Sequence, residues 1–239
     1  KRSMTTSKTT IAPLTNFDPL GYYLRQKLHV TPVIFGLIIL LVNILVDAWI
    51  GWQYNVFLQD KFPLDSPPGI LQDFMALVTD FVYMPILGGL YLWTIQGSTL
   101  LFQRLVDARV FRQDHEFIGI IDSMRRFFSS RYAFVIILFL SVVLALFQLG
   151  AYLGWFGWKT VGGYIEGELA SAYYRFPFWI LLFYTLGFAA YNVAVTIFTL
   201  RKAFRSAEIQ ILPLHPDKCG GLGSISRYTN KVGFGIGTI

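Results

Sequence analysis

The sequence predicts an all-α, polytopic membrane protein with four membrane-spanning helices and further amphipathic helices at the cytoplasmic interface. Two observations support this prediction. Only 14% of the 239 residues are charged, whereas a soluble domain has about 25% charged residues. The charges also occur in blocks, which leaves uncharged apolar runs long enough to cross a bilayer. We therefore expect a multi-pass protein of a plasma membrane or a bacterial inner membrane.

The net charge is +6. In a membrane protein an excess of Lys and Arg marks the cytoplasmic face, where anionic lipids attract it. We therefore expect the bilayer and its anionic lipids as partners, and no nucleic acid.

The first element precedes the membrane. Residues 1–16 are rich in Ser, Thr and Lys and lack periodicity, which predicts a disordered cytoplasmic tail. Asp18 and Pro19 form the start signal of a helix, with Asp18 as the N-cap. Apolar residues then follow at helical spacing up to Leu28. This pattern predicts a short helix on the cytoplasmic membrane surface.

Four apolar runs of about bilayer length follow within a membrane domain that covers residues 17–205. The predicted spans are Val33–Trp52, Phe74–Gln96, Tyr132–Trp155 and Phe176–Leu200. Basic clusters lie before the first span, between the second and third, and after the fourth. Acidic loops lie at the other ends, so both termini are predicted to be cytoplasmic.

The middle basic block contains an apolar stripe. Phe117, Ile121, Met124 and Phe128 recur at spacings of four, three and four, which places them on one face of a helix. This helix is predicted at the cytoplasmic surface, either on the membrane or packed against a partner. Such basic amphipathic helices favour membrane contact.

Residues 206–239 form a cytoplasmic segment rich in Gly and Pro that leads to a possible further helix. The tripeptide His215-Pro216-Asp217 resembles the HPD motif of J-domain cochaperones, where it lies in the loop between two helices. Pro213 interrupts the helix that the family carries before this motif. We interpret His215, Asp217 and Lys218 as a proline-fixed turn and a candidate loop for a protein partner or ligand.

Polar side chains recur in every predicted span. With a rise of 1.5 Å per residue, Asp47 and Asp80 both lie roughly 8–9 Å below the outer boundary. The candidate polar cluster consists of Asn43, Asp47, Asp80, Gln148, Thr185 and Asn192. Such a cluster is able to bind a monovalent cation, relay protons or line a water-filled path. The alternative is that these side chains only hold the helices together.

The two acids interact if they share one depth. Like charges in a low dielectric repel, so one carboxyl group is expected to keep a proton near neutral pH unless a cation lies between them. This predicts that the effects of Asp47→Asn and Asp80→Asn are not additive.

These observations favour a channel or transporter-like protein for a small ion. Because four helices enclose little volume, a homo-oligomer is expected. The alternative is a non-conducting signalling or scaffold module that holds a cytoplasmic partner. The three histidines are widely spaced and there is one cysteine, so no metal site or other cofactor is predicted. No catalytic motif is present, which does not favour an enzyme.

Overall fold

A computed structural model describes residues 11, 14, 18–54, 71, 74–152, 166–209, 219 and 221–237. Within these ranges the chain is helical, apart from short connections and one isolated antiparallel bridge between Phe111 and Ile209. The helices, with the two π-helical turns η1 and η2, are α1 Pro19–Tyr22, η1 Tyr23–Lys27, α2 Pro32–Tyr54, α3 Phe74–Val78, η2 Thr79–Tyr83, α4 Met84–Asp107, α5 Asp114–Phe128, α6 Arg131–Tyr152, α7 Glu166–Ser206 and α8 Gly223–Gly237.

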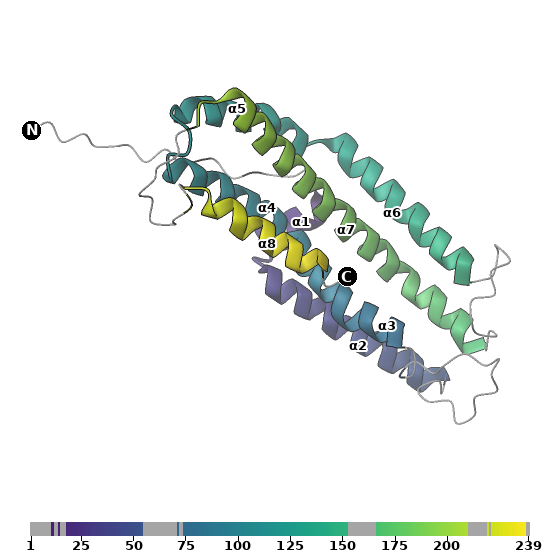
Figure 1. Ribbon diagram of the computed structural model, residues 1–239. Coiled ribbons are helices and arrows are strands. Elements are labelled where there is room, and N and C mark those ends of the chain that lie inside the picture. The colour runs from purple at the N-terminus through teal and green to yellow at the C-terminus, as the bar shows by residue number, and fades with distance from the viewer. Residues whose placement is uncertain are drawn as a thin grey trace, which may run out of the picture.

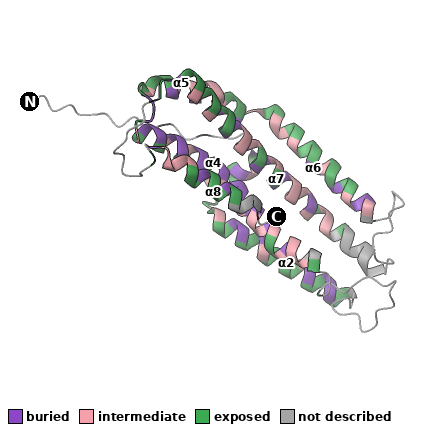
Figure 2. Cartoon of the chain, in the orientation of Figure 1, coloured by how far each residue is buried: buried purple, intermediate pink, exposed green. Residues whose placement is uncertain are grey.

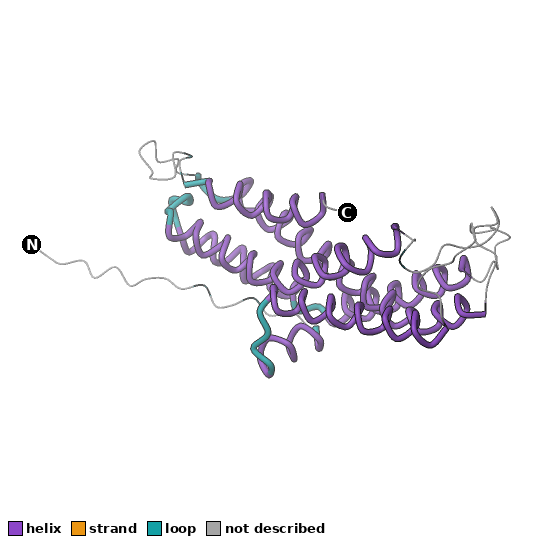
Figure 3. The backbone as a smooth tube through the Cα atoms, turned by 90° about the horizontal axis from the view of Figure 1, so that it is seen from below, coloured by secondary structure: helices purple, strands orange, loops and turns teal. Residues whose placement is uncertain are grey.

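The long helices form an elongated bundle in which α4 is central (Figure 1). α4 packs against α2, α7 and α8, while α6 and α5 pack against α7. Seen from below, α8 and the short N-terminal helix lie on opposite faces of the bundle (Figure 3). More than half of α4 is buried, whereas α2 and α6 expose long apolar faces (Figure 2).

Three described helices are long and apolar enough to cross a membrane. They cover Pro32–Gln53, Arg131–Ala151 and Arg175–Ser206, which match the first, third and fourth predicted spans. The predicted span Phe74–Gln96 lies in the consecutive elements α3, η2 and α4. In the part of this run that α4 forms, Thr94 is buried and accepts a hydrogen bond from Asn192 of α7, whereas Gln96 is exposed.

The apolar stripe of α5 lies inside the protein, so the predicted membrane contact of this stripe is wrong. Phe117 is fully buried, and its ring stacks on Phe111 with 4.3 Å between centroids. The ring also meets Phe102 edge-on at 6.1 Å. α4 and α7 both extend beyond the apolar runs, and their ends supply the apolar surface that covers this stripe.

The N-terminal helix, which consists of α1 and η1, is also packed more deeply than a helix that lies on the membrane surface. Gly21 and Leu24 are buried, whereas Tyr22 and Tyr23 are exposed. Two positions of the predicted tail, Ile11 and Leu14, are described, and both are buried. Their backbone N–H groups donate to side chains of α4, Gln103 Oε1 at 2.8 Å and Thr99 Oγ1 at 3.3 Å.

Candidate functional site

Two acids from the predicted polar cluster meet one arginine. Asp47 lies on α2, Asp80 on η2 and Arg175 near the start of α7. Arg175 Nη2 is 2.8 Å from Asp47 Oδ1, and Arg175 Nη1 is 3.4 Å from Asp80 Oδ2. The three side chains are only 9–12% exposed. We call Asp47, Asp80 and Arg175 the charged trio.

The charged trio carries a formal charge of −1. A guanidinium presents its donors as a planar fork, which allows one arginine to hold two carboxylates. One acceptor stays without a partner, because Asp47 Oδ2 is buried and accepts no hydrogen bond from a described residue. A buried carboxylate oxygen with surplus negative charge nearby is suited to a proton or a small cation.

The local sequence explains why the α-helical hydrogen-bonding pattern is interrupted at Asp80. In η2 the backbone N–H of Met84 donates to Thr79 O, five residues back. It therefore does not donate to the carbonyl oxygen of Asp80, which would be its partner in an α-helix. The next residue, Pro85, has no N–H to donate. The carbonyl of Asp80 is instead satisfied by Asn43 Nδ2 on α2, at 2.5 Å. π-helical turns of this kind are frequent at functional sites.

A second polar group lies where the N-terminal helix meets the bundle. Asp18 is 2% exposed, and its carboxylate accepts hydrogen bonds from the hydroxyl groups of Tyr91 on α4 and Tyr184 on α7. Asp18 occupies the predicted N-cap position, but its side chain makes no capping bond. The carboxylate therefore ties three segments of the chain together.

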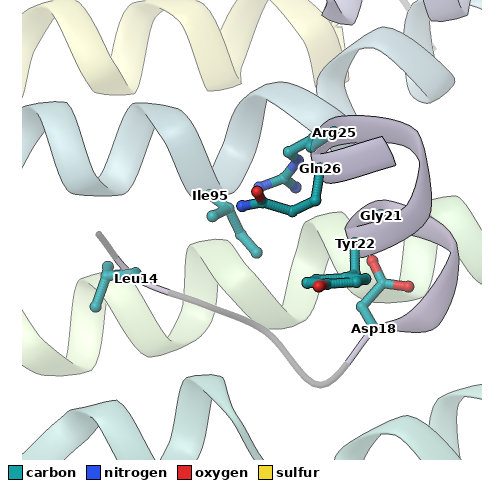
Figure 4. A pocket seen from close by; sticks show the side chains of 7 residues that line it. All are labelled: Leu14, Asp18, Gly21, Tyr22, Arg25, Gln26 and Ile95. Carbon is teal, nitrogen blue, oxygen red and sulfur yellow. The ribbon is translucent and has the colours of Figure 1, made fainter. Parts of the chain in front are cut away.

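A small cavity of about 40 Å³ adjoins this carboxylate (Figure 4). Arg25 and Gln26 extend from the N-terminal helix toward Ile95 of α4, and Leu14 closes one side. Burial lowers the pKa of the Arg25 guanidinium, while Tyr91 and Asp18 act in the opposite direction. Arg25 remains a cation at neutral pH and offsets the charge of Asp18.

A third polar group joins α4, α7 and α8. Asn192 Nδ2 donates to Thr94 Oγ1 at 3.1 Å. Ser98 Oγ lies 2.7 Å from Thr196 Oγ1 and 3.2 Å from the hydroxyl of Tyr228. All five side chains are buried and hydrogen-bonded, so this group forms a hydrogen-bonded seam between the helices.

The predicted polar cluster is thus only partly assembled in one place. Asn43, Asp47 and Asp80 come together. Thr185 follows Arg175 by about 15 Å along α7 and donates to Leu182 O of its own helix. Asn192 belongs to the third polar group. Gln148 lies half-buried on α6, which packs against α7.

Sequence reasoning missed Arg175 and the role of Asp18. Arg175 stands directly before the fourth apolar run, where it reads as a loop cation. The signal for it was the unmet condition that two close acids need a cation between them. The candidate partner loop, His215, Asp217 and Lys218, lies outside the described residues.

Comparison with known proteins does not assign a family. No family model matches the chain, and no match was found among curated proteins or solved structures. The function is therefore argued from the sites themselves.

Proposed function

We propose that this protein is a channel or transporter-like membrane protein that moves protons or a small monovalent cation through the charged trio. The observation that carries this proposal is the buried oxygen Asp47 Oδ2, which has no described hydrogen-bond partner in a group of net charge −1. Buried ionisable groups in membrane helices are costly and typically mark ion or proton pathways.

The chemistry follows from the charges. A cation or proton at Asp47 brings the formal charge of the trio to zero. It also competes with Arg175 for the Asp47 carboxylate, because both are held by the same negative charge. Arg175 then remains with Asp80. The trio therefore has two arrangements whose balance depends on the bound cation, as a transport site requires.

The proposed membrane arrangement has four spans, formed by α2, the run α3–η2–α4, α6 and α7, with both termini cytoplasmic. The positions of the basic blocks support this orientation. The trio then lies in the outer half, since Asp47 is about 10 Å along the axis from the end of α2 at Tyr54. The exposed apolar faces of α2 and α6 suit lipid or further copies of the chain.

The test is cation and proton flux into liposomes that contain the purified protein. We expect flux with the wild-type protein and its loss in Asp47→Asn, which removes the charge but keeps the shape. The matched control is Asp122→Asn, an exposed acid on α5. Cation-dependent thermal stabilisation of wild type, absent in Asp47→Asn, detects binding even when the path is closed. Flux and stabilisation that survive Asp47→Asn contradict the proposal.

A second candidate function is a non-conducting module that relays the binding of a cytoplasmic partner. The observation that favours it is the third polar group, in which Tyr228 of α8 bonds to Ser98 inside the bundle. A partner that displaces α8 breaks this seam. If the wild-type protein shows no flux and binds no cation, that result favours this second candidate.

A further inference from the structure

Two adjoining hollows lie on the face of the bundle that carries α8. The first is an apolar groove of about 400 Å³ between α2 and α4, lined among others by Leu37, Leu40 and Ile86. The second is a pocket of about 210 Å³ between α4 and α8, lined by Arg104, Arg227 and Lys231. Both hollows include Trp93 and Lys231, so the apolar groove leads into the basic pocket.

Helical spacing creates the basic pocket. On α4, Trp93, Gly97 and Arg104 lie at i, i+4 and i+11, which is one face of a helix. On α8, Ser224 and Arg227 share a face with Lys231 for the same reason. α4 and α8 pack against each other, so these two faces meet.

The pocket has surplus positive charge. Arg104, Arg227 and Lys231 form no ion pair with a described residue, and no described carboxylate lines the pocket. Arg227 and Lys231 are like charges four residues apart, which destabilises a helix unless an anion lies nearby. Ser224 Oγ, which also lines the pocket, is buried and has no hydrogen-bond partner among the described residues. The pocket therefore offers three cations and a free hydroxyl to an anion.

Trp93 marks the junction of the two hollows. Lys231 Nζ lies 5.5 Å from the centre of its ring. The ring packs at a tilt against the ring of Tyr228, with 5.4 Å between centroids. It also lies against Gly97, where an added Cβ atom would be 2.6 Å from the ring. An indole between an apolar and a charged region is the arrangement found at the headgroup level of membranes.

We propose that this site binds one anionic glycerophospholipid, with its phosphate in the basic pocket and an acyl chain in the apolar groove. The occupant follows from the two hollows together. A free anion would leave the groove between α2 and α4 uncovered, and a neutral lipid would leave three cations unpaired. This inference goes beyond the proposed transport function and is independent of whether the charged trio binds a cation.

The test is native mass spectrometry of the purified, delipidated full chain, titrated with phosphatidylglycerol or with phosphatidylcholine of the same acyl chains. We expect one tightly held phosphatidylglycerol and at least tenfold weaker binding of phosphatidylcholine. The triple variant Arg104→Gln, Arg227→Gln and Lys231→Gln should bind phosphatidylglycerol roughly 100-fold more weakly, since each cation near an anionic headgroup contributes about 1 kcal/mol. The single variant Arg227→Gln should lose part of this affinity and serves if the triple variant does not fold.

The matched control removes three exposed cations elsewhere, Arg126→Gln, Arg201→Gln and Arg205→Gln, and should keep wild-type affinity. Equal loss in both triple variants overturns the proposal, because it indicates only general surface charge. Leu37→Trp fills the groove and should weaken binding of the lipid. Unchanged binding in Leu37→Trp, or full displacement of the lipid by equimolar inorganic phosphate, overturns the lipid assignment in favour of a free-anion pocket.

Discussion

Arg175 donates to the carboxylate of Asp47 across 128 positions of the chain, and this bond ties the start of α7 to the last turns of α2. The same guanidinium holds Asp80. Buried ion pairs contribute little net stability when complete, but removing one partner leaves an uncompensated buried charge. Removal of Arg175 is therefore expected to have a larger electrostatic cost than removal of either carboxylate.

The first prediction concerns Arg175→Gln. It leaves two buried carboxylates without their cation, and we expect a loss of about 3–5 kcal/mol in the free energy of unfolding. The measurement is unfolding in mild detergent, followed by circular dichroism. The control is Arg112→Gln, which breaks an exposed pair with Glu208 and should cost at most about 1 kcal/mol. Similar losses in the two variants would argue against a buried trio.

The second prediction concerns the sign of the coupling between the two acids. Asp47→Asn or Asp80→Asn alone leaves Arg175 with one carboxylate, which is a neutral pair. The double variant leaves Arg175 without either acid, so its loss should exceed the sum of the two single losses by about 0.5–3 kcal/mol. Repulsion between two acids without a cation predicts instead that both single variants and the double variant gain stability, because each substitution then removes a buried like charge. A double-mutant cycle of unfolding free energies distinguishes the two arrangements.

The third prediction concerns Asp18. Tyr91→Phe and Tyr184→Phe each remove one hydroxyl donor from its buried carboxylate, and each should cost about 1–3 kcal/mol of stability. Tyr22→Phe is the control, because Tyr22 is 58% exposed. Thermal unfolding of the three variants checks this. If Tyr22→Phe matches the other two, the carboxylate does not depend on these hydroxyl groups.

The fourth prediction concerns the apolar stripe of α5. Phe117→Ala should cost about 3–5 kcal/mol, because it leaves a cavity between Phe102 and Phe111. Phe127→Ala, on the exposed side of the same helix, should change stability far less, since Phe127 is 55% exposed. Chemical unfolding measures both variants. A helix bound only through the membrane would show a small effect for Phe117→Ala as well.

The helices were predictable because their signals are local. The length and composition of the apolar runs that begin at Pro32, Arg131 and Arg175 can be read within each run. The helical spacing of the stripe from Phe117 to Phe128 can likewise be read within that segment alone. What covers that stripe was not predictable, because its partners Phe102 and Phe111 precede it in a stretch without a matching pattern. The periodic spacing of apolar residues indicates that one face of a helix is apolar, but it does not say whether lipid or protein covers that face.

The candidate site was predictable only in part, for a related reason. The cost of burying Asp47 and Asp80 could be stated from the sequence, together with the need for a cation. The cation itself depends on the register in which α7 packs on α2 and η2. Likewise, Asp18 reads as an N-cap from its neighbours, and only the approach of Tyr91 and Tyr184 gives it another role.

The last prediction concerns the close approach of α2 and α4, on which the register of the charged trio depends. A Cβ atom on Gly36 would lie 2.7 Å from the carbonyl oxygen of Pro85, so the two helices have to shift in Gly36→Ala. We expect this variant to lose about 1–3 kcal/mol through overpacking. The control is Gly119→Ala on α5, where an added Cβ has nothing within 4 Å and should stabilise the helix by about 0.5–1 kcal/mol. Opposite shifts of the unfolding temperature are therefore expected for the same chemical change, and a gain in Gly36→Ala would contradict the contact between α2 and α4.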